Sequence, residues 1–142
     1  MYIKKNVSKQ EYSIHKMVSE KINCIPTPKI YEYDEITKTL KMEKIPQMSI
    51  SDMYGEKSDD VPSYIFDEIR KIIIKLNENN INYPDITGYN FIEYENKIYI
   101  IDFGDANIIE DKNQTISETS SIISPFVNDF INGLNQWNPD FR

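Results

Sequence analysis

The hydrophobic positions of this chain recur with helical spacing in some stretches and with strand-like spacing in others. The clearest helix is predicted for residues 62 to 78, because its aliphatic side chains recur every three or four positions. Another is predicted after Ser8, which stands three residues before Glu11 in the spacing of a capping box. A third is predicted to open at Ser124-Pro125, since proline suits the first position of a helix. The side chains expected to face inward from these helices are Ile14, Met17, Val18 and Ile22; Ile65, Ile69, Ile72, Ile73 and Leu76; and Phe126, Val127, Phe130, Ile131 and Leu134.

Short runs of β-branched and aromatic residues between turn-forming residues predict the strands. A short helix over "SISDMYG" is predicted to end at Gly55. Strands come first along the chain and helices dominate later, so the predicted fold class is α+β, in a single domain spanning residues 1–142. The strands are expected at residues 1 to 5, on either side of Asp34-Glu35 as a hairpin, and near 90 to 94 and 97 to 101, joined by Glu95-Asn96.

Composition narrows the class of protein. The chain is 39% hydrophobic and 27% charged, which indicates a globular protein, and its net charge of −7 argues against binding to nucleic acid or to an anionic membrane. It has no apolar run long enough to cross a bilayer, and its first residues lack the apolar segment of a signal peptide. Cys24 is the only cysteine, so no internal disulfide can form and a cytoplasmic location is expected. Cys24 itself is predicted to be a small buried residue.

Three side chains with oxygen atoms suited to metal binding stand at the ends of the second predicted hairpin. Asp85 and Asn90 precede the hairpin, and Asp102 follows it, so the returning strand can bring all three to one site. Phosphoryl transfer needs such a set, because a carboxylate must orient the attacking hydroxyl and accept its proton. Oxygen ligands must also hold magnesium against the triphosphate.

This arrangement resembles the protein kinase superfamily, and within it the small KEOPS-complex and RIO-type kinases. The family's catalytic loop has an Asp followed by four residues and an Asn, and its metal motif is Asp-Phe-Gly. Here Tyr83-Pro84-Asp85 is followed by four residues and Asn90, and then by Asp102-Phe103-Gly104. The resemblance implies that Asp85 is the catalytic base and that Asn90 and Asp102 are magnesium ligands. Thr87 matches the Ser or Thr that these small kinases carry after the catalytic Asp.

The upstream half of the chain also resembles this family, over residues 2 to 134 in all. The resemblance implies a reduced two-lobe architecture, with a stunted N-terminal sheet in residues 1–45 and a short helical C-terminal lobe in residues 46–142. It further implies an ATP site. Its residues would be Lys4 (or Lys5) on the phosphates, Glu11 as the partner of that lysine, Met42 beside the adenine, and the backbones of Glu43 and Ile45 as hydrogen-bonding partners of the adenine.

The sequence also departs from the family. Its four glycines are Gly55, Gly88, Gly104 and Gly133, so no glycine-rich loop precedes Lys4. Tyr83 and Pro84 stand where the family has His and Arg.

The resemblance implies an ATP- and magnesium-dependent phosphotransferase that acts on Ser or Thr of a protein substrate. Three alternatives stay open: a pseudokinase that binds nucleotide or a regulatory protein partner, a small-molecule kinase of the aminoglycoside or choline type, and an α+β interaction domain that is no kinase. Oligomeric state is open as well.

Several residues have simpler interpretations. Glu11 is equally explained by the capping box. His15 is expected to be partly exposed on its helix, and the Ser/Thr-rich residues 115 to 121 are expected to form a loop. Trp137 and Phe141 could cover the core or bind a partner.

Overall fold

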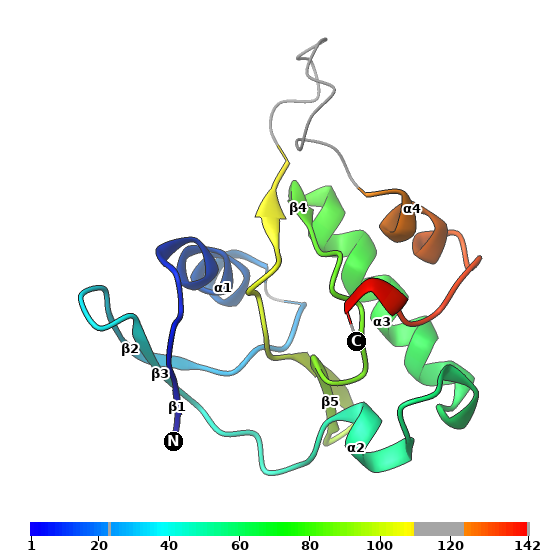
Figure 1. Cartoon of the computed structure of the whole chain (residues 1–142), viewed down its shortest axis with the longest axis horizontal. Coiled ribbons are helices and arrows are strands. Elements are labelled where there is room, and N and C mark those ends of the chain that lie inside the picture. The colour runs from blue at the N-terminus through cyan, green and yellow to red at the C-terminus, as the bar shows by residue number, and fades with distance from the viewer. Residues whose placement is uncertain (23, 110–123, 142) are drawn as a thin grey trace, which may run out of the picture.

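The computed structural model describes residues 1–22, 24–109 and 124–141. It has an α+β fold, as predicted: a small sheet and helix α1 form one side, and the longer helix α3 with the short helices α2 and α4 forms the other (Figure 1). The elements are β1 (Tyr2–Lys4), α1 (Lys9–Lys21), β2 (Ile30–Asp34), β3 (Thr39–Met42), α2 (Ile50–Tyr54), α3 (Ser63–Glu78), β4 (Ile81–Asn82), β5 (Phe91–Tyr94), β6 (Lys97–Ile100), β7 (Asn107–Ile108) and α4 (Pro125–Ile131), with 3₁₀ turns η1 (Ser58–Asp60) and η2 (Pro139–Phe141).

The first sheet is antiparallel, with strand order β1-β3-β2, so β1 is an edge strand. A small apolar cluster of Val7, Leu40 and Met42 lies between this sheet and the start of α1. The Tyr33 hydroxyl donates a hydrogen bond of 2.7 Å to the Val7 carbonyl oxygen. The connection from β1 to α1 is therefore fixed against the sheet. Ser8 caps α1, because its hydroxyl oxygen accepts from the Glu11 N–H at 3.0 Å.

The main core lies between α1, α3 and the second hairpin. All five aliphatic side chains predicted on the inner face of α3 are buried. Full burial of such a side chain contributes roughly 1.5–3 kcal/mol, so this face is a principal source of stability. The α1 side chains Ile14, Val18 and Ile22 belong to the same cluster. Helix α1 therefore packs on both the first sheet and the part of the molecule that contains α3.

The second hairpin positions the candidate site. Strands β5 and β6 pair in register, and Glu95 and Asn96 both have positive φ, of 50° and 63°, as a tight two-residue turn requires. At the open end of the hairpin, the Ile101 N–H donates to the Asn90 carbonyl oxygen at 3.0 Å. This bond places the backbone of Asn90 directly beside the chain that enters Asp102.

Helix α4 is shorter than its apolar pattern predicts. It ends at Ile131, and Gly133 (φ 77°) donates its N–H to the Phe130 carbonyl oxygen at 3.0 Å. Leu134 therefore lies beyond the helix and is 72% exposed, so its predicted inward position is wrong. The Ser/Thr-rich residues 115 to 121 lie outside the described residues.

Two further expectations about single residues are wrong. His15 is buried, because its ring lies against Phe103 and its Nε2 is 2.9 Å from the Pro28 carbonyl oxygen. Burial lowers the pKa of His15 below its ordinary value. Cys24 is exposed rather than buried. Within the described ranges, no helix has the length and apolar character needed to span a membrane.

Candidate active site

A cleft of about 360 Å³ lies between the first sheet and the second hairpin. Of the eight site residues predicted from the sequence, six line it: Lys4, Met42, Glu43, Ile45, Asn90 and Asp102. Glu11 lies behind Lys4, with its Oε2 2.5 Å from the Lys4 Nζ. Asp85 lines a second cavity of about 260 Å³. Tyr89 and Asn90 line both cavities, so the two adjoin.

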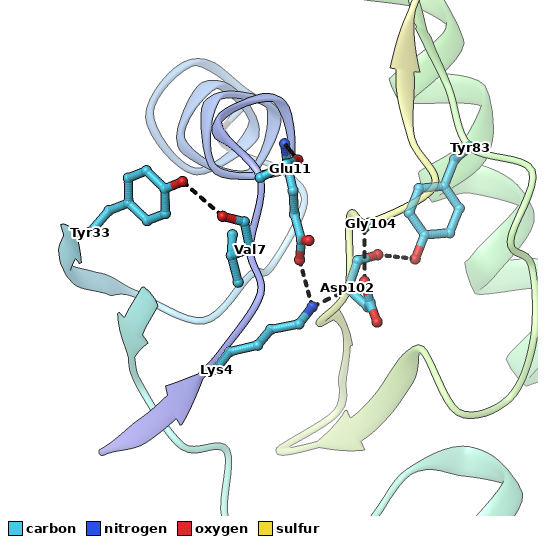
Figure 2. Close-up of polar contacts among 8 residues, drawn as sticks. Lys4, Val7, Glu11, Tyr33, Tyr83, Asp102 and Gly104 are labelled. Carbon is cyan, nitrogen blue, oxygen red and sulfur yellow. Dashed lines mark hydrogen bonds and ion pairs between the residues drawn. The ribbon is translucent and has the colours of Figure 1, made fainter. Parts of the chain in front are cut away.

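Lys4 links the two sides of the molecule. Its Nζ lies 2.5 Å from Glu11 Oε2 on α1 and 3.1 Å from Asp102 Oδ1 beyond β6 (Figure 2). The four residues between β1 and α1 turn the chain back, which brings the end of the strand beneath the first turn of the helix. Glu11 makes two contacts with different atoms: its backbone N–H is capped by Ser8, and its carboxylate accepts from Lys4 Nζ.

The electrostatics of this network favour a charged Lys4. Burial alone would lower the pKa of Lys4, but the carboxylates of Glu11 and Asp102 outweigh it and raise the pKa above 10.5. Lys4, rather than its neighbour Lys5, is thus the lysine that faces the cleft with its charge in place.

Tyr83 supports Asp102 from the other side. Its hydroxyl donates to the backbone carbonyl oxygen of Asp102, and Figure 2 shows the ring reaching that residue from the side opposite Lys4. Tyr83 is 1% exposed, and its ring meets those of Phe91 and Phe103 edge-on at 6.0 Å. Burial, with nearby carboxylates, raises the pKa of Tyr83 well above 10, so the hydroxyl keeps its proton and donates. The Asp102 carboxylate is held in turn by the Gly104 N–H at 2.8 Å.

Asp85 occupies a tight loop at the second cavity. Asn90 Nδ2 donates to the Asp85 carbonyl oxygen at 2.9 Å, and the Thr87 hydroxyl donates to the Asp85 carboxylate at 3.3 Å. Burial raises the pKa of Asp85 to about 6, and the negative charges of Asp105 and Asp102 add to this rise. A carboxylate with such a pKa is ionised at neutral pH and is a stronger base than an ordinary aspartate.

The chain after β3 offers two free backbone groups to the cleft. The Glu43 N–H is used, since it donates to the Lys29 carbonyl oxygen at 2.8 Å. The Glu43 carbonyl oxygen and the Ile45 N–H make no hydrogen bond with any other residue that the structure describes. These are an acceptor and a donor, as an adenine edge requires. Met42 is buried beside them.

Asn90 and Asp102 suit a magnesium ion only as partial ligands. Asn90 Nδ2 is engaged with Asp85, which leaves the amide oxygen, and the Asp102 side chain is 39% exposed with Oδ2 unpaired among the described residues. Three or more His, Cys, Asp or Glu side chains do not gather at any one point in this part of the chain. Magnesium accepts one or two protein ligands when phosphate oxygens and water complete its shell. The residues therefore fit an ion shared with a triphosphate.

Comparison with known proteins agrees with this geometry. A solved structure of the Cydia pomonella granulovirus kinase, PK-1, aligns with a TM-score of 0.58 at 14% sequence identity, over 76% of this chain and 43% of that one. The chain thus has a reduced protein-kinase-like fold. The family model described as the RIO domain matches residues 1–117, and the chain belongs to that family. The resemblance to RIO-type kinases is confirmed.

Two curated relatives are each called a probable bifunctional tRNA threonylcarbamoyladenosine biosynthesis protein. The one from Methanosphaera stadtmanae is 31% identical, and the one from Methanocaldococcus jannaschii is 34% identical, each over 91 residues. Each alignment covers 62% of this chain. The chain spans only 17% and 16% of the lengths of these relatives.

Sequence reasoning missed two contributors to the site. Tyr83 was noted only as a departure from the family's His, although its hydroxyl holds the backbone of Asp102. A buried Tyr whose hydroxyl needs a partner was the available signal. Asn138 was not singled out, although it contacts the loop that carries Asp85. No motif in the sequence marks it.

Proposed function

We propose that this chain is an ATP- and magnesium-dependent phosphotransferase that acts on Ser or Thr hydroxyls of a protein substrate. The observation that carries the proposal is the Lys4 ammonium held between Glu11 and Asp102 at a cleft that adjoins the cavity of Asp85. RIO-domain membership and the kinase-like fold support it.

On this proposal, the cleft binds ATP. The Glu43 carbonyl oxygen and the Ile45 N–H hydrogen-bond the adenine edge beside Met42, and Lys4 contacts the phosphates. Asn90 and Asp102 hold the magnesium ion, which when bound would neutralise charge on the triphosphate. The net charge of −7 makes that neutralisation necessary, since the protein itself repels the nucleotide.

Asp85 acts on the acceptor. It accepts the hydroxyl proton as the acceptor oxygen bonds to the γ-phosphorus and the bond from that phosphorus to the bridging oxygen of ADP breaks. The acceptor needs room to approach Asp85, and the second cavity, of about 260 Å³, lies at that residue. The pKa of about 6 favours this role at neutral pH.

The test is transfer of labelled γ-phosphate to general protein substrates and to the chain itself. Asp85→Asn is expected to abolish transfer with ATP binding nearly intact, because Asp85 acts on the hydroxyl. Asp102→Asn is expected to lower both transfer and magnesium-dependent ATP binding. Asp129→Asn, on the exposed face of α4, is the matched control and should behave as wild type. If wild type and Asp85→Asn incorporate the same background amount of label, transfer to these acceptors is refuted.

A regulatory binding module is the second candidate, and the loop before Asp85 favours it, because Tyr83 and Pro84 stand where the family has His and Arg. A module of this kind would bind nucleotide or a protein partner without transferring phosphate. ATP binding by wild type, with no transfer to any offered acceptor and unaffected by Asp85→Asn, is the result that would favour this second function.

A further inference from the structure

The C-terminal segment, residues 135–141, returns to the loop that carries Asp85 (Figure 1). Asn138 makes two hydrogen bonds there: its side-chain Nδ2 donates to the Pro84 carbonyl oxygen, and its backbone N–H donates to the Ile86 carbonyl oxygen, both at 2.8 Å. These two carbonyls lie on either side of Asp85. Asn138 is 2% exposed, so neither bond competes with solvent.

Asn138 is itself firmly held. Its side-chain oxygen accepts from the Asp140 N–H at 3.1 Å, so both ends of its amide are used. The preceding residue, Trp137, is 4% exposed, and its ring centroid lies 4.5 Å from that of Phe66 on α3. The Trp137 N–H also lies 3.4 Å from the Ser58 hydroxyl oxygen. The segment is thus anchored to the main core and can serve as a rigid support.

The opposite side of the loop rests on α2. The Ser51 N–H donates to the Gly88 carbonyl oxygen at 3.0 Å, and a Cβ at Gly88 would lie 2.1 Å from Ser51 Oγ. Only glycine permits this approach. Inside the loop, the bonds are local, such as the Thr87 N–H to the Asp85 carbonyl oxygen at 3.0 Å. The support from outside therefore comes from α2 on one side and from Asn138 on the other.

We propose that Asn138 is a positioning residue for phosphoryl transfer. It binds the carbonyl groups of Pro84 and Ile86, the residues before and after Asp85, and so directs the Asp85 carboxylate into the acceptor cavity, whose wall includes Trp137 and Phe141. The inference rests on the proposed function for the role of Asp85. It assigns to the C-terminal segment a task in catalysis beyond covering the core.

The first test compares kcat with ATP binding. Asn138→Ala removes the bond to Pro84, and Asn138→Asp keeps the size of the side chain and its acceptor oxygen but removes the Nδ2 donor. Each is expected to lower kcat about tenfold or more, since small misplacements of a catalytic group cost that much. The dissociation constant for ATP should stay within about twofold of wild type, because the loop contact lies outside the ATP cleft.

Two variants serve as matched controls. Asn132→Ala removes a similar bond, from Nδ2 to the Asn128 carbonyl oxygen at 3.0 Å, at the end of α4. Ile73→Val lowers stability from within α3 without touching the loop. Both should keep kcat near wild type when assayed well below their melting temperatures. An unchanged kcat in Asn138→Ala and Asn138→Asp, or an equal fall in Ile73→Val, would overturn the proposal.

A second readout does not depend on activity. Amide hydrogen exchange measured by NMR reports how firmly the loop is held, with the Thr87 and Asn90 N–H groups, which donate within the loop, as probes. In both Asn138 variants these amides are expected to exchange faster than in wild type, whereas Asn132→Ala should leave them unchanged. If wild type transfers no phosphate but exchange is still faster in the Asn138 variants, the proposed function fails and the support of the loop by Asn138 stands. If exchange is unchanged in both Asn138 variants, the positioning role fails.

Discussion

Among single residues, Asp85 gives the most direct dependence on pH. Its proposed role as a base requires the ionised carboxylate, and burial raises its pKa to about 6. Lowering the pH below about 6 should therefore reduce kcat by about tenfold per further pH unit, whereas raising it above about 7 should change kcat little. The measurement is the transfer rate across this range at saturating ATP. A rate that stays level down to about pH 4 would assign the base role elsewhere.

The same pKa predicts an effect on stability that needs no substrate. A carboxyl whose pKa is higher in the folded state than in the unfolded state destabilises the fold at neutral pH, and this penalty disappears as the pH falls below the ordinary value of 3.8. Asp85→Asn should thus stabilise the chain at neutral pH, by clearly less than the ~3 kcal/mol of the full shift, because the half-buried carboxyl is screened by solvent. Urea unfolding of both proteins at about pH 7 and at about pH 3.5 checks this, with the difference shrinking in acid. A less stable variant at neutral pH would contradict it.

Lys4 should matter for both stability and nucleotide binding, unlike Lys5. Lys4→Met leaves the Glu11 carboxylate, 7% exposed, without its cation, and should cost about 1–3 kcal/mol. Because the pKa of Lys4 is raised, its contribution is present at neutral pH and is lost only as the pH rises through that raised value, above 10.5.

Lys5→Met is the matched control, since Lys5 is the exposed neighbour. Thermal unfolding and ATP titration at neutral pH should separate the two variants. Equal effects from both would show that the network around Lys4 contributes nothing specific.

How far single residues could be predicted depended on whether a motif marked them. The spacing of Asp85, Asn90 and Asp102 is local in sequence, so the pattern placed all three, and the structure brings them to adjoining cavities. His15 was mispredicted because its burial comes from Phe103, far along the chain. Asn138 contacts Pro84, which is 54 residues earlier, and no local pattern reports such a contact.

At the scale of elements, prediction succeeded where the signal was local and periodic. Helix α3 and the hairpin β5–β6 were placed to within two residues, because a long apolar stripe and a two-residue turn leave little freedom. The pairing of β4 with β7 was missed: each strand has two residues, too few for a period, and the pairing joins residues that are 25 and 27 positions apart. The end of α4 was misplaced because Leu134 continues the apolar pattern beyond the helix.

The capping of α1 should affect the site as well as the helix. Ser8→Ala removes the acceptor for the Glu11 N–H and should cost about 1 kcal/mol. It should also weaken ATP binding, because Glu11 holds Lys4 from that same first turn. Ser49→Ala removes the equivalent cap of α2 and is the matched control, expected to lose stability but not ATP affinity. Calorimetric titration measures the ATP affinity of both variants, and thermal unfolding measures their stability. A fall in ATP affinity in Ser49→Ala but not in Ser8→Ala would contradict the prediction.

At the scale of the whole molecule, the proposed function depends on two parts that meet at one cleft. The first sheet supplies Lys4 and the chain after β3, while the second hairpin supplies Asn90 and Asp102. Lys4 joins them by its ion pairs, and α1 packs on both. The acceptor cavity lies on the helical side, between α2 and the C-terminal segment. The proposed nucleotide site and the proposed acceptor site are thus built from different segments, so a substitution can weaken one without weakening the other.

The cleft itself predicts weak and salt-sensitive ATP binding. In the family, backbone N–H groups of a glycine-rich loop cover the phosphates and exclude water. In the described part of this chain, the side chains of Lys4 and Asp102 are 21% and 39% exposed, so the triphosphate would lie in a site open to solvent. Charge contacts of the triphosphate with Lys4 and the metal are then screened.

Calorimetric titration with ATP and magnesium should give a dissociation constant of tens of micromolar or weaker, roughly −6 kcal/mol, and weaker still with added salt. A protein that covers the phosphates should tighten it. Nanomolar binding that salt does not change would mean that other residues of this chain cover the phosphates.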